Sequence, residues 1–185
     1  KEKIDFCLVG EPTNPNKLGE MIKIGRRGSI TGELTVIGVQ CHVSYPHLGN
    51  NPATTLVQIL KKLKEIKFDK GTKDFQPTNL EVTKINIDNT ADNVIPGMAK
   101  ATFNIRFNNK HSSYSLKNRL NRIFKKITQK NKSKFKVEYR ISGEAFLNKP
   151  NKTTYMIQDI IKTITKIKPK LSTTGGTSDA RFIRK

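Results

Sequence analysis

The order of apolar periodicities between residues 29 and 143 is the feature that most restricts the fold of this chain. Apolar residues at helical spacing predict two helices, over 51–68 and 113–131. Alternation of apolar and polar residues predicts four strands, over 29–38, 79–88, 99–108 and 134–142. The resulting βαββαβ order is the ferredoxin-like plan, in which both helices cover one face of an antiparallel sheet. We therefore predict an α+β domain over residues 29–143.

The flanking segments predict pieces of a second, interrupted domain. Residues 4–13 form an apolar run that ends in Gly10-Glu11-Pro12, which is typical of a buried strand followed by a tight loop. Residues 153–167 predict a helix, and the glycine turn within 173–179 precedes a last helix from about Thr177. We interpret 1–28 and 144–185 as two pieces of an incomplete α/β domain, and the chain as an interior part of a longer protein.

Charge is the most prominent compositional feature, with a formal net charge of +20. The lysines are scattered among Asn and Ile, and no recognition helix, stacking-aromatic motif or Cys/His finger spacing accompanies them. A solvated lysine surface is therefore favoured over a nucleic-acid partner. Two unpaired cysteines, Cys7 and Cys41, and the lack of an apolar segment near 18 residues favour a cytoplasmic protein with no membrane partner.

Three motifs of the flanking segments contain residues that could take part in chemistry. Glu11 could bind a divalent metal, although no nearby His or Asp completes a site and a solvated loop glutamate is the simpler reading. Arg26 and Arg27 lie between glycines and could present one guanidinium to a carboxylate, or form a surface turn. The glycine turn, with Thr177 or Ser178 as cap, could bind an anion at the start of a helix.

The predicted α+β domain contains three further candidates. His42 follows a strand directly and could donate a hydrogen bond to a substrate oxygen, or be satisfied by local backbone. Asn93 and Arg106 flank the second hairpin, and Arg106 alternates with apolar residues, so it needs a carboxylate or an acidic ligand as partner. His111 lies in a turn and receives no role.

Several motifs together resemble those of succinyl-diaminopimelate desuccinylases, which belong to a wider family of dinuclear-zinc deacylases and aminopeptidases that includes acetylornithine deacetylase. They occur in this order: "VGEPT", "GRRGS", "GVQCHVSYPHLGNNP", "DNVIPG", "NIRF" and "TTGGTSDARF". The resemblance implies an interrupted catalytic α/β domain that binds two zinc ions, for which cobalt could substitute, and an inserted lid domain that forms a homodimer through its sheet edge and helix. It also implies hydrolysis of a small dicarboxylic amide, N-succinyl-LL-2,6-diaminopimelate, to succinate and LL-diaminopimelate in lysine and peptidoglycan-precursor biosynthesis.

The same resemblance implies roles for individual residues. Glu11 would be a zinc ligand, and His42 would stabilise the oxyanion in the partner subunit's active site, where Tyr45 and Asn93 would also reach. Residues that would bind substrate carboxylates, order the hinge or meet the substrate at the helix start are Arg26, Ser29, Arg106, Gly176 and Thr177.

Parts of the family pattern are missing, and other functions stay open. The H-x-D motif, the Glu-Glu pair and the C-terminal histidine ligand do not occur, so the chain alone is expected to be inactive. Asp92 before Asn93 is a smaller departure, because the closest relatives often have Asn there. The alternatives are a related deacylase acting on another N-acyl amino acid, and a non-catalytic dimerisation or nucleic-acid-binding module.

Overall fold

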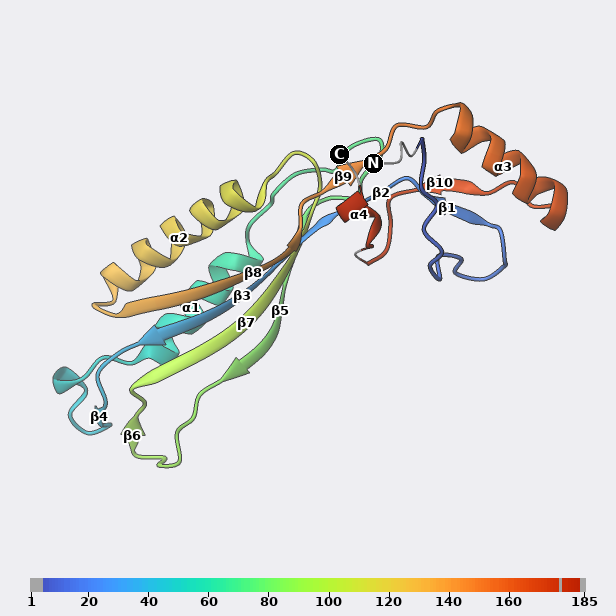
Figure 1. Ribbon diagram of the computed structural model, residues 1–185. Coiled ribbons are helices and arrows are strands. Elements are labelled where there is room, and N and C mark those ends of the chain that lie inside the picture. The colour runs from blue at the N-terminus through green and yellow to red at the C-terminus, as the bar shows by residue number, and fades with distance from the viewer. Residues whose placement is uncertain (1–4, 177, 184–185) are drawn as a thin grey trace.

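The computed structural model describes residues 5–176 and 178–183. Its largest unit is a four-stranded antiparallel sheet, in the order β5-β7-β3-β8, with two helices on one face (Figure 1). This mixed α/β unit follows the predicted βαββαβ order. Its elements are β3 (Gly28–Ile37), α1 (Pro52–Lys64), β5 (Asn79–Asn86), β7 (Met98–Phe107), α2 (Ser113–Lys130) and β8 (Lys134–Gly143).

Side-chain caps begin both helices of this unit. The Asn51 side chain accepts the Ala53 N–H at 2.9 Å, and Pro52 occupies the first turn of α1. Ser112 and Ser115 form a reciprocal capping box at α2, with both hydrogen bonds at 3.1 Å. Each cap satisfies backbone N–H groups that the helix leaves free and contributes about 1 kcal/mol.

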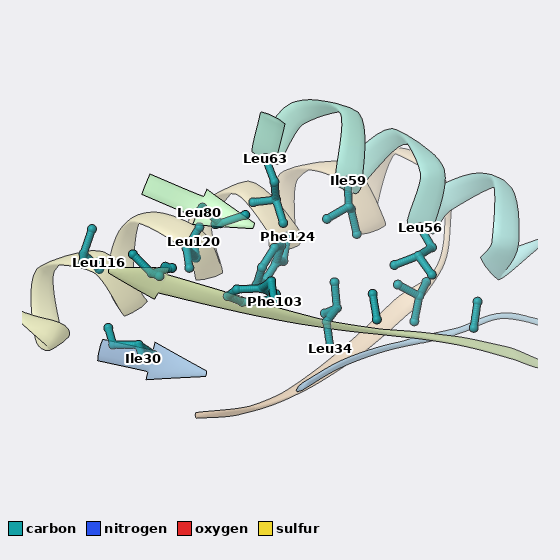
Figure 2. Close-up of a cluster of buried hydrophobic side chains, with 14 of the residues drawn as sticks. Ile30, Leu34, Leu56, Ile59, Leu63, Leu80, Phe103, Leu116, Leu120 and Phe124 are labelled. Atoms are coloured by element: carbon teal, nitrogen blue, oxygen red, sulfur yellow. The ribbon is translucent and has the colours of Figure 1, made fainter. Parts of the chain in front are cut away.

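The core lies between the sheet and the two helices (Figure 2). Phe103 and Phe107 of β7 are fully buried on the helix-facing side. The Phe103 ring packs against Phe124 of α2, with centroids 6.1 Å apart. Gly32 of β3 lies under this ring, because an added Cβ would come within 2.2 Å of Phe103 Cζ. Full burial of each such side chain stabilises the fold by roughly 2–3 kcal/mol. β7 therefore forms the centre of the core.

Two short strand pairs join the beginning of the described chain to its end. β1 (Met21–Lys23) runs parallel to β10 (Lys170–Ser172). β2 (Gly25–Arg26) pairs antiparallel with β9 (Phe146–Leu147). The two flanking segments, far apart in sequence, therefore lie side by side next to the base of the large sheet (Figure 1).

A third strand pair lies at the far end of the large sheet (Figure 1). β4 (Cys41–His42) pairs with β6 (Val94–Ile95), and the short 3-10 helix η1 (Pro46–Leu48) follows β4. His42 is thus part of a small ladder, whereas the sequence predicted a loop.

The predicted strand at residues 4–13 is wrong for the described part of that segment. Residues 5–13 have no regular structure, and Phe6 and Leu8 are 59% and 69% exposed. A buried strand needs neighbours that complete its hydrogen bonds and cover its faces. No strand pairs with residues 5–13 in the part of the chain that the structure describes, so Glu11 lies in irregular chain.

The last two helices agree only partly with prediction. The helix predicted over 153–167 is α3 (Lys152–Thr165). The final helix, α4 (Ala180–Ile183), is short, and the Ser178 hydroxyl accepts the Ala180 N–H at 3.2 Å. Thr177, the expected first residue of this helix, lies outside the described residues.

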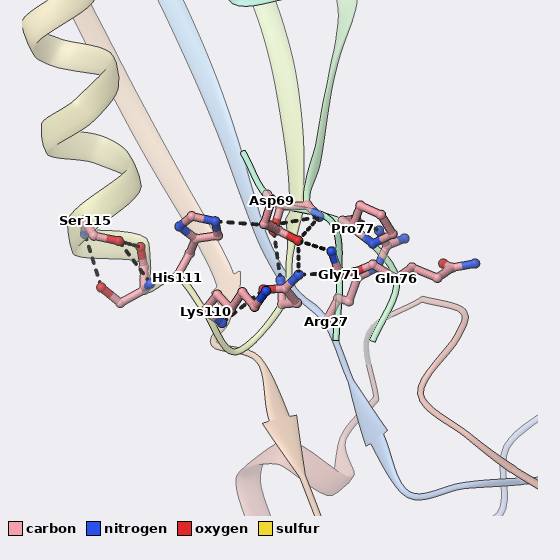
Figure 3. A network of polar contacts seen from close by, with 11 residues as sticks. Arg27, Asp69, Gly71, Gln76, Pro77, Lys110, His111 and Ser115 are labelled. Atoms are coloured by element: carbon pink, nitrogen blue, oxygen red, sulfur yellow. Dashed lines mark hydrogen bonds and ion pairs between the residues drawn. The ribbon is translucent and has the colours of Figure 1, made fainter. Parts of the chain in front are cut away.

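A polar network organises the loop between α1 and β5 (Figure 3). The Asp69 side chain is 5% exposed. Its carboxylate accepts the Gly71 N–H at 2.6 Å and the Asn108 side-chain amide at 2.7 Å, and lies 3.1 Å from His111 Nε2. His111, to which the sequence assigned no role, thus ties this loop to the turn before α2.

Asp69 remains ionised to unusually low pH. Burial alone would raise the pKa of this carboxyl, but hydrogen bonds from Thr78, Gly71 and Asn108 outweigh burial and lower the pKa from 3.8 to about 2. Because the folded-state pKa is depressed, the ionised group stabilises the fold above pH 4, and this contribution disappears as the pH falls toward 2.

We expect Asp69→Asn to lower the free energy of unfolding at pH 7 by roughly 2 kcal/mol, because the depressed pKa corresponds to about that much stabilisation. Urea denaturation at pH 7, 4 and 2.5 measures the difference from the unmodified chain, which should shrink toward pH 2.5. Asp88→Asn, at an exposed position, is the control and should change stability by less than about 0.5 kcal/mol. An equal loss at pH 7 and pH 2.5 would show that the ionised carboxylate is not the source of the stabilisation.

Candidate functional site

Arg26 and Arg27 point in different directions, as expected for neighbours on an extended segment. Arg26 is 6% exposed. Its guanidinium donates to the Thr174 carbonyl at 3.1 Å and to the Glu11 carboxylate at 3.3 Å. Arg27 donates instead to the Pro77 carbonyl at 3.0 Å. Arg26 is therefore the arginine that faces Glu11 and the segment leading to the glycine turn.

Glu11 is held as an ionised carboxylate. The Ser178 hydroxyl donates to it at 2.8 Å, and the Asp179 N–H donates at 3.3 Å. The Ser178 hydrogen bond has the largest effect and lowers the pKa of Glu11 below 4.5. Burial opposes it, and the hydrogen bonds from Asp179 and Arg26 lower the pKa further. An ionised carboxylate suits a divalent cation. Residues 5–176 and 178–183 contain no group of three or more His, Cys, Asp or Glu side chains that could hold a metal, so Glu11 can be only one ligand of such a centre.

Positive charge gathers around the start of β3, where we define Lys23, Arg26, Arg27 and Arg106 as the basic junction. Burial, followed by repulsion from Arg26, lowers the pKa of Lys23 below 10.5. Burial, followed by repulsion from Arg106, lowers the pKa of Arg27. Within the described residues, one buried guanidinium nitrogen on each of the three arginines has no hydrogen-bond partner. Because buried cations with free donors are unfavourable, the basic junction favours an anionic ligand.

Arg106 lies directly opposite Ser29 in the pairing of β7 with β3. Ser29 is 2% exposed, and its hydroxyl accepts the Asn104 side-chain amide at 3.4 Å. The sequence left a carboxylate or an acidic ligand as partner for Arg106, and the part of the chain that the structure describes contains no ion pair to it. The described residues therefore supply no carboxylate partner to Arg106, and the acidic ligand stays a prediction.

The glycine turn leaves space for a ligand beside its backbone. Gly175 has φ +102°, which favours glycine, and a Cβ added at Gly176 would meet no atom within 4 Å. The described part of α4 begins at Ala180, and an anion site at the start of this helix stays a prediction. Thr177, the other predicted residue of this turn, is outside the described residues.

Arg181 is a candidate that the sequence reasoning missed. Its Nε is buried and has no partner among residues 5–176 and 178–183. Gly143 makes room for it, because a Cβ at that position would lie 2.8 Å from Arg181 Cδ. The sequence shows an arginine shortly after the glycine turn, but only the fold brings it next to Gly143.

Three predicted site residues, His42, Tyr45 and Asn93, gather at the far end of the large sheet, and we call them the tip cluster. The His42 and Tyr45 rings have centroids 6.0 Å apart. His42 Nε2 lies 3.3 Å from the Asn93 side-chain amide, and all three residues are exposed. The structure thus brings these residues together, and their side chains are accessible to a second molecule.

Donor groups face both ring nitrogens of His42. Its Nδ1 lies 3.1 Å from the Ser44 N–H, and its Nε2 lies 3.3 Å from Asn93 Nδ2. A neutral imidazole has a single acceptor nitrogen, so these two contacts do not select one tautomer. The ring is exposed, and its protonated nitrogen is the donor that His42 can offer to a substrate oxygen.

The basic junction and the tip cluster lie at opposite ends of β3. Ser29 is the second residue of this ten-residue strand, and His42 follows its far end. A strand of that length spans about 30 Å. The two groups of residues therefore cannot meet around one small ligand within a single chain.

Sequence comparison places the central part of the chain in a known family. The profile of the peptidase dimerisation domain matches residues 24–132. The chain is 84% identical to a succinyl-diaminopimelate desuccinylase of Pelagibacter ubique, over 100% of this chain and 48% of the relative. It is 52% identical to the enzyme of the same name from Parvibaculum lavamentivorans, over 99% of this chain and 46% of the relative. The chain thus spans about half the length of the curated relatives it matches.

Solved structures of the same fold have little sequence similarity to the chain. Aminopeptidase PepT from Bacillus cereus superposes with a TM-score of 0.73 at 14% identity, over 92% of this chain and 44% of that structure. A tripeptidase from Staphylococcus aureus superposes with a TM-score of 0.72 at 16% identity, over 89% and 42%. In residues 5–176 and 178–183, no helix has the length and apolar character that crossing a membrane requires. Since the matched profile covers more than half of its residues, the chain belongs to the peptidase dimerisation domain family.

Proposed function

We propose that this chain is the central part of a succinyl-diaminopimelate desuccinylase, which hydrolyses N-succinyl-LL-2,6-diaminopimelate to succinate and LL-diaminopimelate. Support comes from the 84% identity to the Pelagibacter ubique relative of that name. The observation that carries the proposal is the gathering of four cations, Lys23, Arg26, Arg27 and Arg106, at the basic junction. We place the enzyme in the cytoplasm, in lysine and peptidoglycan-precursor biosynthesis.

The charge of the proposed substrate fits the basic junction. N-succinyl-LL-diaminopimelate carries a carboxylate on the acyl group and two on the amino-acid part. Arg26, Arg106 and Lys23 would bind or orient these carboxylates, and Ser29 would contribute a hydroxyl. The backbone at Gly176 and the neighbouring Thr177 would contact the substrate from the glycine turn. Each charge-assisted hydrogen bond formed with a free guanidinium donor contributes about 1.5–3 kcal/mol.

The reaction needs metal ions for which this chain supplies part of the site. We propose that Glu11 is one ligand of a centre with two zinc ions, replaceable by cobalt, whose remaining ligands and catalytic base lie outside this chain. Bound metal would polarise the amide carbonyl and activate water. Ser178 and Arg26 would hold the Glu11 carboxylate in place, since both contact it.

We propose that the tip cluster acts in the active site of a second subunit. The length of β3 keeps His42 away from the basic junction of its own chain. In a two-fold dimer with antiparallel sheets, the tip of one sheet lies beside the base of the other. The His42 imidazole would then stabilise the oxyanion of the tetrahedral intermediate, and Tyr45 and Asn93 would contact the partner's substrate.

The homodimer would form through the β5 edge and α1. Both β5 and β8 are edge strands of the large sheet. Val57 of α1 and Ile85 of β5 are 63% and 60% exposed. The β8 edge instead presents exposed Lys134, Lys136, Arg140 and Glu138, and charged side chains on an edge oppose pairing with a second copy.

We divide the chain into an inserted lid and dimerisation domain, residues 29–143, and two catalytic pieces, 1–28 and 144–185. The pairing of β1 with β10 and of β2 with β9 supports this division, because it joins the two flanking pieces to each other. The lid has its own core around β7, which supports its treatment as a separate unit.

Two other functions fit less well. An acetylornithine-type deacylase would need fewer cations, since its substrate has a single carboxylate and a basic side chain. A nucleic-acid-binding module of this plan needs exposed aromatic residues on the central strands. Phe103 and Phe107 are 0% exposed and face the helices, so the sheet does not offer such a surface through them.

We expect a protein of the relatives' full length that contains this chain, loaded with zinc, to hydrolyse N-succinyl-LL-diaminopimelate with a kcat/KM roughly 100-fold above that for N-acetylornithine. The reason is that N-acetylornithine, with a single carboxylate, makes at least one fewer charge-assisted contact with the basic junction. Arg106→Leu should lower the ratio of the two kcat/KM values at least about tenfold. Arg140→Leu, at an exposed position of β8, is the matched control and should leave this ratio unchanged. Equal or better cleavage of N-acetylornithine would overturn the substrate assignment.

We expect Val57→Lys to convert the full-length dimer to monomer, because a charge would replace an apolar side chain in the interface. Light scattering after size-exclusion chromatography measures the mass. Tyr114→Lys is the matched control, since Tyr114 is 71% exposed on α2, and this variant should stay dimeric. A dimer in the first variant and a monomer in the second would place the interface on the β8 side.

A further inference from the structure

The loop between α1 and β5, residues 66–78, makes a contact with the catalytic segment that no part of the proposed reaction uses. We call it the strut loop. The Thr173 hydroxyl donates to the carbonyl of Asp74 in this loop. Thr173 is 5% exposed, so the contact is shielded from water. Residues 99 positions apart are thereby joined across the base of the lid.

The strut loop is firmly attached to the lid. Asp69 holds its beginning and end together, since it accepts hydrogen bonds from the N–H groups of Gly71 at 2.6 Å and Thr78 at 3.2 Å. Asn108, which is 0% exposed, binds both Asp69 and the Gln76 carbonyl. Figure 3 shows contacts converging on the Asp69 carboxylate, among them those from Gly71 and His111. A loop with so many internal hydrogen bonds is stiff. A shift of the lid would therefore move the whole loop, and with it the residues that the loop contacts.

The tip of the strut loop is also buried. Phe75 is 3% exposed but lies outside the cluster that forms the main core. Gly71 has φ +82°, and an added Cβ would meet the Phe75 carbonyl at 2.7 Å, so the loop is tightly turned at this point. Arg27 fixes the loop from the side of β3 through the Pro77 carbonyl at 3.0 Å. The strut loop is thus held by the lid, by the basic junction and by Thr173.

Thr173 leads directly into the glycine turn. The next residue, Thr174, receives hydrogen bonds from Arg26 at 3.1 Å and from Lys23 at 2.8 Å. The Ser172 hydroxyl lies 2.9 Å from the Thr174 hydroxyl. Cations of the basic junction therefore hold one residue of this segment, and the strut loop holds the residue before it.

We propose that the strut loop is a positioning element for the substrate-facing glycine turn, and that the Thr173–Asp74 hydrogen bond couples the lid to this turn. The substrate-facing role of the turn rests on the proposed function, whereas the coupling itself does not. Thr173 and Asp69 are positioning residues, because they act on the substrate through the position of the glycine turn and not by direct contact.

The test uses the full-length protein and compares Thr173→Val, which has the same shape without the hydroxyl, with Thr173→Ser, which keeps the hydroxyl. Hydrogen exchange followed by mass spectrometry reports on residues 66–78 and 172–176 separately. Thr173→Val should raise exchange about fivefold or more in both segments, and Thr173→Ser should resemble the unmodified protein. Thr163→Val is the control, because the Thr163 hydroxyl donates within α3, to the Asp159 carbonyl.

The same variants separate this proposal from the proposed function. With succinylated substrate, Thr173→Val should raise KM about five- to tenfold with a smaller change in kcat, and Thr173→Ser should restore KM. Unchanged exchange in residues 66–78, or Thr173→Ser behaving like Thr173→Val, would overturn the coupling. If the unmodified protein cleaves neither N-succinyl-LL-diaminopimelate nor N-acetylornithine, the proposed function fails. The hydrogen-exchange result still decides whether the strut loop is coupled to the glycine turn.

Discussion

The long antiparallel pairing of β3 with β7 and β8 sets the distances on which the rest of this structure depends. Ten residues of β3 are hydrogen bonded to β7 without a break in register. The strand is therefore stiff, and its two ends stay about 30 Å apart. The basic junction lies at one end and the tip cluster at the other. A chain built in this way divides its polar site residues into two groups that only another molecule can bring together.

This separation explains features that would otherwise be unfavourable. Buried guanidinium nitrogens without partners cost stability, and so do exposed apolar side chains such as Val57 and Ile85. Both are understandable if the chain works in a larger assembly, where a carboxylated substrate satisfies the arginines and a second copy covers α1 and β5. The network around Asp69 is different, because it is satisfied within the described chain and ties the loop between α1 and β5 to the turn before α2.

Much of the large sheet could be predicted from sequence, since its strands alternate regularly and its helices carry local signals such as the Asn51 cap. The predicted strand at residues 4–13 failed because an apolar run forms a strand only when neighbouring strands are present. The candidate residues were also recognisable, mainly from motifs. The grouping of these residues in space could not be predicted, because the pairing of Ser29 with Arg106 depends on the register between β3 and β7. Asp69, His111 and Thr173 were missed since their partners are distant in sequence.

We propose that one active site needs residues from two chains, and subunit mixing tests this proposal most directly. Full-length Glu11→Gln and His42→Ala variants should each be inactive as homodimers. After equimolar mixing and exchange of subunits, half of the dimers are heterodimers, and each has one site with both residues intact, so activity should recover to about a quarter of the unmodified level. A mixture that contains heterodimers but stays as inactive as either variant would show that His42 serves its own chain or has no catalytic role.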